Sequence, residues 1–305
     1  MFGFANALLL ALFAAAGVDL VLALRCKAVG QLFTVPHYLF GDWGSEARAR
    51  WGQRAFLLAL MLYEFTVVFC NSMARENWPF LQGQLAPVLD MIMYTLLCGK
   101  ILLGTRYTWR ELICAGVLYF VARWVYFNGQ NIWFLGLVMV LLAAKAVPLR
   151  RSLQAFLGCG VPTLALVEVL HFAGIIAPDA LSERSGSYRL MFGYGHPNTF
   201  GGIVLGLVLA WVLLRQAKIP SAEIAAVAGV GLFLYKGPAS RSPALCTFLL
   251  AVLLVCAKPV DARKGRKLTA GLCAAMVPVV GAISYILPLF VVKIGPWADE
   301  IGPAW

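Results

Sequence analysis

The sequence predicts an all-α fold: a polytopic integral membrane helical bundle of about ten transmembrane helices that forms a single domain over residues 1–305. Three observations predict it. First, 61% of the residues are hydrophobic and only 13% are charged, far from the balance of a soluble domain. Second, apolar runs of membrane-spanning length recur along the whole chain. Third, cationic residues gather in alternate loops between these runs.

The predicted spans are runs of roughly 17–25 apolar residues, shortened where glycine or polar residues trim their ends. Their limits are 2–24, 55–72, 85–104, 112–127, 132–147, 153–176, 201–214, 222–235, 244–257 and 268–292. The stretch 32–41 is too short and too broken by Pro36 and His37 to cross a membrane, so it is predicted to lie at the interface. Residues 128–131, Asn-Gly-Gln-Asn, predict a tight turn.

The charge distribution predicts the orientation. Alternate loops carry eighteen of the twenty-five Lys and Arg residues, the other loops carry six, and Arg123 lies within the fourth span. The cation-rich loops are predicted to face the cytoplasm, which places both termini and the loop 178–196 outside. The same distribution accounts for the net charge of +11, so no nucleic-acid partner is predicted.

The most informative stretch lies between the sixth and seventh spans, in the external loop 178–196. Pro197 suits the first position of a helix, so His196-Pro197-Asn198 predicts a helix mouth with free backbone N–H groups and a positive dipole end. Arg184 and Arg189 lie just upstream. Guanidinium groups beside a helix N-terminus predict a site for a lipid-linked phosphate.

A second segment, Ser240-Arg241-Ser242-Pro243, has the same plan of a polar stretch, an arginine and a proline at a helix start. Two such mouths on one face could hold two phosphates or one diphosphate. The alternative is that these are ordinary loop arginines at the lipid headgroups. Arg123 has two interpretations as well, a functional charge or a snorkelling residue near the external end of its span.

The other ionisable residues indicate a functional site less clearly than these two segments do. His196 is either an acid–base group or a helix cap. Glu168 and His171, one turn apart, predict a polar contact between helices, and Asp19, Glu64 and Asp90 predict hydrogen bonds within the bundle. No Walker A loop, GxSxG motif, clustered Asp pair, CxxC or Cys/His metal spacing occurs. The sequence therefore predicts no cofactor and no metal.

These motifs resemble the O-antigen polymerase and ligase superfamily, most of all the capsular and exopolysaccharide repeat-unit polymerases of Gram-positive bacteria. The resemblance covers roughly residues 112–257 and depends on the order and spacing of several segments. They are Arg184, Arg189, residues 193–198, Ser240-Arg241-Ser242, residues 128–131 and Ala144-Lys145.

The resemblance implies a membrane glycosyltransferase that joins oligosaccharide repeat units carried on undecaprenyl diphosphate, at the outer face of the bacterial plasma membrane. The lipid diphosphate is the leaving group, so neither nucleotide sugar nor metal is needed. Implied partners besides membrane lipids are a flippase and a chain-length regulator. The predicted catalytic residues are His196, Arg189 and Arg241, and the predicted substrate-binding residues are Arg184, Asn198, Ser240, Ser242 and Arg123.

Two other functions stay open at this point. A ligase would transfer a finished glycan to another acceptor, and the residues do not separate it from a polymerase. A non-catalytic flippase or transporter would show internal repeats or a charged midplane cavity, whereas the ionisable cluster here lies at one face. Family members continue with a large external loop and further spans. Residues 293–305 are therefore expected to begin such a loop, in a truncated product, a fragment or a short member.

Overall fold

The computed structural model of the chain describes residues 44–105, 107–129, 133–176, 182–184, 187–215 and 219–257, together with the single residues Ala7, Ala14 and Val18. Contacts divide the chain into two units, Met1–Leu249 and Leu250–Trp305, and the described part of the second unit is the end of the last helix. The predicted first and tenth spans, apart from the three single residues, lie outside the described residues, as do the stretches 32–41 and 293–305.

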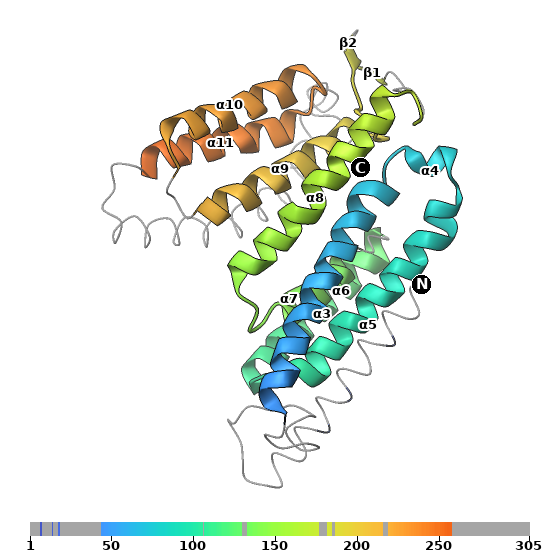
Figure 1. Cartoon of the computed structure of the whole chain (residues 1–305), viewed down its shortest axis with the longest axis vertical. Helices are drawn as coiled ribbons and strands as arrows, with labels where there is room; N and C mark the ends of the chain where they lie inside the picture. Colours follow the sequence, from blue (N-terminus) through green and yellow to red (C-terminus); the bar gives the residue numbers. More distant parts are fainter. Residues whose placement is uncertain are drawn as a thin grey trace. The chain divides into compact units, whose positions relative to one another are not determined.

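The described chain is helical except for one short hairpin (Figure 1). The elements in order are α3 (Ser45–Phe65), η1 (Thr66–Cys70), α4 (Ala74–Asn77), η2 (Leu81–Leu85), α5 (Ala86–Gly104), α6 (Trp109–Gly129), α7 (Trp133–Ala143), α8 (Leu149–Phe172), β1 (Ser182–Arg184), β2 (Ser187–Arg189), α9 (Pro197–Arg215), α10 (Ser221–Lys236) and α11 (Arg241–Ala257). The segments η1 and η2 are single turns of π-helix that continue α3 and precede α5.

Among the residues that the structure describes, four helices are long and apolar enough to cross a membrane, namely Glu46–Cys70, Leu81–Gly104, Leu149–Phe172 and Pro197–Arg215. Shorter apolar helices cover Ile113–Trp124 and Arg241–Cys256. The prediction of a helical protein with helices of membrane-spanning length is confirmed for these four. The larger number of spans stays a prediction.

Two predicted boundaries were wrong. The second span was predicted to start at residue 55, after a basic loop, but α3 begins ten residues earlier at Ser45. Arg50 and Arg54 are exposed on this added part of the helix, so a search for apolar runs does not find it. The predicted turn at 128–131 was also wrong in its first half, because Asn128 and Gly129 belong to α6.

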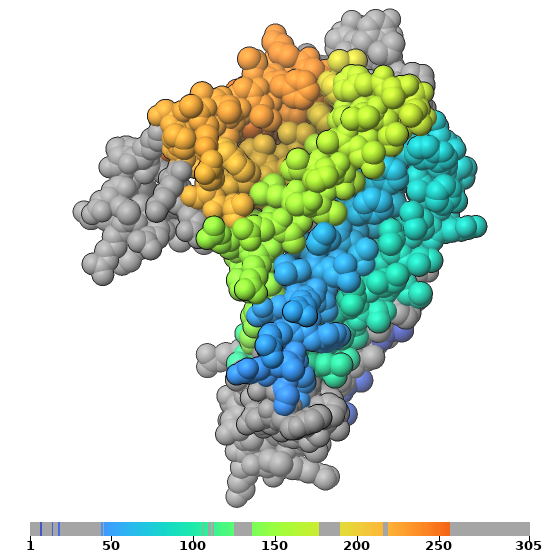
Figure 2. All heavy atoms as spheres, viewed as in Figure 1, coloured from blue at the N-terminus to red at the C-terminus, as the bar shows by residue number. Residues whose placement is uncertain are grey.

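Helix α3 packs against both α5 and α8, and α8 packs in turn against α9. Figure 2 shows α3 between α5 and α8 on one face. Small residues allow close approach between these helices. A Cβ on Gly160 of α8 would lie only 2.7 Å from Oε1 of Glu64, the buried carboxylate of α3.

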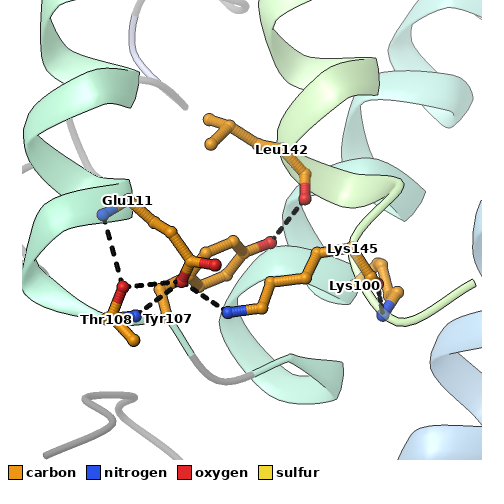
Figure 3. Close-up of polar contacts among 6 residues, drawn as sticks. All are labelled: Lys100, Tyr107, Thr108, Glu111, Leu142 and Lys145. Atoms are coloured by element: carbon orange, nitrogen blue, oxygen red, sulfur yellow. Dashed lines mark hydrogen bonds and ion pairs between the residues drawn. The ribbon is translucent and has the colours of Figure 1, made fainter. Parts of the chain in front are cut away.

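A buried lysine of α5 joins the ends of α5 and α7 and packs against α3 (Figure 3). Lys100 is 1% exposed, and its Nζ donates hydrogen bonds to Oγ1 of Thr105 (2.5 Å) and to the carbonyl oxygen of Lys145 (3.1 Å). Gly52 and Gly104 flank its stem, since a Cβ on Gly52 would lie 2.9 Å from Cδ of Lys100. Burying an ammonium group is unfavourable unless its donors are used, and these two bonds reduce that penalty.

A second polar group lies beside it at the start of α6. Thr108 and Glu111 form a capping box: the Thr108 N–H donates to Oε2 of Glu111 (2.7 Å), and the Glu111 N–H donates to Oγ1 of Thr108 (3.4 Å). Lys145 forms an ion pair with the same carboxylate oxygen at 2.5 Å, and Tyr107 donates to the carbonyl oxygen of Leu142 (Figure 3). These bonds tie the start of α6 to the end of α7.

Changing Glu111 to glutamine is expected to remove part of the dependence of stability on pH. Burial raises the pKa of Glu111, but hydrogen bonds from Lys145 and Thr108, with the Lys145 charge, outweigh it and hold this pKa below its usual value. A lowered pKa stabilises the fold fully above the unfolded value of about 4.3, and this contribution is lost as pH falls through the folded-state pKa. The side chain is 43% exposed, so the contribution is about 0.5–1 kcal/mol.

The measurement is the thermal unfolding midpoint in detergent between neutral pH and about pH 3. Glu46→Gln is the control, because Glu46 is exposed in the first turn of α3. Equal loss of pH dependence in both variants would contradict the role of the Glu111 pair.

Candidate functional site

The candidate site begins where the loop before α9 lies against the end of α3. The Met73 N–H donates to the carbonyl oxygen of Gly193 (2.8 Å), and the phenol of Tyr194 donates to the carbonyl oxygen of Val68 (3.1 Å). Val68 belongs to η1, where the wider π-helical turn changes the pattern of intrahelical bonds. The Tyr194 side chain is fully buried. These contacts hold the loop at a defined position.

Backbone conformation is also special in this loop. Phe192 and Gly193 both lie in the left-handed region, with φ of 48° and 72°. At Gly193 any Cβ would also lie 3.2 Å from Cγ1 of Val167 and 3.3 Å from Cβ of His171. Glycine is therefore required at position 193 by both conformation and space.

Phenylalanine rings from three helices pack against Phe192 of this loop. The Phe192 ring stacks on Phe200 of α9, with centroids 4.8 Å apart and an angle of 19°. The same ring meets Phe233 of α10 edge-on at 5.5 Å and Phe172 of α8 at 6.5 Å. Offset and edge-on contacts at these distances are favourable, so the loop is part of a packed layer that includes the ends of α8 and α10.

Tyr194 acts here as a neutral donor. Burial raises the pKa of Tyr194, and the negative charges of Glu168 and Glu64 raise it further. The phenol therefore keeps its proton and can donate it to Val68.

Helix α9 begins at Pro197, so the prediction from the His-Pro-Asn motif is confirmed at this residue. His196, immediately before it, accepts a hydrogen bond at Nδ1 from the backbone N–H of Asn198 (3.1 Å). His196 thus caps α9. A neutral ring whose Nδ1 accepts this bond carries its proton on Nε2, which leaves a donor facing away from the cap.

The structure brings the two predicted helix N-termini, those of α9 and α11, into contact. Oγ of Ser240, just before α11, donates a hydrogen bond of 2.9 Å to Oδ1 of Asn198 in the first turn of α9. Ser240 is fully buried. Gly201, one turn further along α9, permits this approach, since a Cβ there would lie 2.9 Å from Cβ of Ser240 and 3.0 Å from Cγ of Pro243. Two predicted substrate-binding residues, 42 positions apart, are therefore in contact.

The start of α11 keeps its backbone donors uncapped. The Ser240 hydroxyl bonds to Asn198 rather than to its own helix, and the N–H groups of Arg241 and Ser242 have no acceptor among the described residues. Both side chains are exposed. An arginine beside unsatisfied N–H groups at a helix start can bind an anion. His196, Asn198, Ser240, Arg241 and Ser242 together form the rim of the candidate site.

Arg184 and Arg189 lie in the hairpin that leads into this loop. Strand β1 pairs antiparallel with β2, and the register aligns Ser182 with Arg189 and Arg184 with Ser187. Positions 184 and 189 are thus diagonal neighbours on one face of the hairpin. The backbone register therefore places these two positions close together, and their part in an anion site stays a prediction.

No described contact brings Arg184 or Arg189 to the rim, and none brings Arg123 there. Arg123 is partly buried in α6, and the main packing partner of α6 is α7. Glu168 and His171 lie in the last turns of α8, where His171 touches the site loop at Gly193. These two residues therefore belong to the support of the loop.

Arg75 also lies beside this loop, although the sequence motifs do not include it. It lies in α4, and its Nη2 is 3.7 Å from the point that a Cβ on Gly195 would occupy, directly before His196. The signal in the sequence was that Arg75 is one of the six cationic residues in the loops predicted to be external. Its distance from the motif, more than 100 positions in sequence, hid the contact.

Within the described part of the chain, no group of three His, Cys, Asp or Glu residues could hold a metal ion. Comparison with known protein families, with characterised proteins and with solved structures finds no match.

Proposed function

We propose that this protein is a metal-independent membrane glycosyltransferase that polymerises oligosaccharide repeat units carried on undecaprenyl diphosphate. In this proposal about ten spans cross a bacterial plasma membrane, and the rim faces outward. The family resemblance of the sequence motifs supplies the reaction.

The observation that carries the proposal is the contact between the two helix starts. The Asn198–Ser240 hydrogen bond holds the mouth of α9 beside the mouth of α11, so the polar segments lie at one end of their helices. Lys100, Lys145 and the start of α8 lie at the other end of the 24-residue helix α8, about 36 Å away along its axis. An external anion site and a cation-rich cytoplasmic end agree with this arrangement.

The proposed reaction is a transfer of a glycosyl group between lipid-linked saccharides. A hydroxyl oxygen of the acceptor sugar attacks the anomeric carbon of the donor, and the bond from that carbon to the diphosphate oxygen breaks. The diphosphate leaves with the electron pair, and Arg184, Arg189 and Arg241 stabilise its negative charge. The hydroxyl proton passes to a carboxylate base, for which Glu76 and Glu183 are the candidates in the described chain.

His196 orients the acceptor in this scheme. Its Nδ1 is already engaged by the Asn198 N–H, so the ring offers Nε2–H as a donor to the acceptor hydroxyl oxygen. The carboxylate rather than the imidazole then removes the proton.

The test is chain growth by the purified protein in liposomes that contain lipid-linked repeat units. Arg184→Ala, Arg189→Ala and Arg241→Ala are each expected to slow growth by about 100-fold or more, because each removes a donor to the leaving group. Arg150→Ala is the matched control, since Arg150 is exposed at the start of α8, at the other end of the helices. Normal growth in all three variants would exclude the proposed role of the arginines.

A further inference from the structure

Arg75 is held in place from both sides. The segment before it is bound to the site loop by the Met73–Gly193 hydrogen bond, and Ala74 is fully buried. After it, Nδ2 of Asn77 donates to the carbonyl oxygen of Ile175, beyond the end of α8. The short helix α4 therefore has a fixed position beside the residues that precede α9.

The Arg75 guanidinium has no hydrogen bond or ion pair with any other described residue, although it is partly buried. Glu76, the next residue, is exposed and makes no such contact with it. A guanidinium carries five N–H donors in a planar fork that matches the oxygens of a phosphate group. A partly desolvated cation with unused donors is stabilised by an anion at that place.

Gly195 presents only backbone atoms beside the guanidinium. Its φ is outside the left-handed region, and a Cβ on it would make only ordinary contacts, at 3.6 Å from Sδ of Met73 and 3.7 Å from Nη2 of Arg75. Neither backbone conformation nor crowding requires glycine at this exposed position. The missing side chain leaves the exposed backbone of Gly195 uncovered beside the guanidinium, directly before His196 in the sequence.

We propose that Arg75 binds a phosphate-type anion over Gly195, beside His196, as the α4 side of the rim. The identification of this anion as the diphosphate of a lipid carrier rests on the proposed function, whereas the anion site itself does not. The headgroup of an ordinary anionic phospholipid has the same chemistry and is the other source of such a group.

The experiment measures binding of farnesyl diphosphate to the full chain in nanodiscs of phosphatidylcholine. Arg75→Gln is expected to weaken binding about ten-fold or more, the effect of losing hydrogen bonds to a charged ligand. Arg75→Lys should recover part of the affinity, because it keeps the charge and loses the fork. Gly195→Ala should weaken binding about three-fold, with an unchanged thermal midpoint, by filling the space beside the guanidinium.

Two matched controls should bind as the wild type does. Arg150→Gln removes a cation at the other end of the helices, and Gly202→Ala adds a methyl group where no atom lies within 4 Å. Wild-type affinity in Arg75→Gln would overturn the inference, whatever the result of the chain-growth assay. Arg75-dependent binding by a protein that never extends a glycan would instead uphold the anion site and refute the proposed reaction.

A second set of nanodiscs, in which phosphatidylglycerol replaces part of the phosphatidylcholine, separates the two sources of the anion. Both outcomes support a phosphate-binding Arg75. If phosphatidylglycerol abolishes the difference between wild type and Arg75→Gln, the site holds a phospholipid headgroup. If the difference persists, the site selects the diphosphate.

Discussion

Replacing Tyr194 by alanine is expected to destabilise the protein by about 3–5 kcal/mol, the usual range for removing a fully buried aromatic side chain. The ring lies in the cluster that surrounds the site, with Ala74, Val167, Phe200 and Leu234 as buried members. Its loss leaves a cavity under the loop and frees the segment that precedes α9. The measurement is the free energy of unfolding in mixed micelles, followed by helical content during titration with a denaturing detergent.

Tyr194→Phe separates packing from hydrogen bonding. It keeps the ring and removes only the bond to the Val68 carbonyl oxygen, so a loss of about 1 kcal/mol is expected. Tyr235→Ala is the control for removing an aromatic ring from an exposed position, because Tyr235 is 50% exposed. Similar losses from Tyr194→Ala and Tyr235→Ala would show that the loop is not anchored by the buried ring.

Replacing Gly201 by valine is expected to separate the starts of α9 and α11. The new Cβ would overlap Ser240 and Pro243, at 2.9 Å and 3.0 Å, so one of the two helices must shift. Forcing extra atoms into a packed contact costs about 1–3 kcal/mol. The shift also breaks the Asn198–Ser240 hydrogen bond, so binding of farnesyl diphosphate and glycan chain growth are expected to fall together.

Gly202 provides a control one residue away. Gly202→Val introduces the same side chain into the same turn of α9, at a position with no atom within 4 Å of its Cβ. It should keep both the stability and the binding of the wild type. If the two valine variants behave alike, the close contact at Gly201 does not determine the geometry of the rim.

Local sequence patterns predicted the helices well where they depend on apolar length. The limits of α5, α8 and α10 lie within a few residues of the predicted ones, and Pro197 begins α9 as expected. The start of α3 was missed because its first turns carry exposed arginines, and an apolar-run search rejects them. That part of the helix is supported by contacts with α5 at Gly52 and Gly104, which no local pattern records.

The candidate site was predicted only in part, because only some of its features depend on neighbouring residues in the sequence. Proline and polar residues at a helix start are local signals, so both mouths could be found from the sequence. The role of His196 as a cap depends on which ring nitrogen meets the Asn198 N–H, and composition does not determine that geometry. Arg75 could not be assigned, because its neighbour Gly195 is close to it only after the Met73–Gly193 bond forms.

The sequence by itself determined that this chain forms apolar helices of membrane-spanning length with polar, arginine-bearing starts, because helix length and capping depend on neighbouring residues. Only the tertiary structure decided which helix N-termini lie in contact. The Asn198–Ser240 bond joins residues 42 positions apart, and the Tyr194–Val68 bond joins residues 126 positions apart. Such pairings depend on how side chains fit between helices, at glycines such as Gly201, and apolar helices do not choose their partners by hydrophobicity alone.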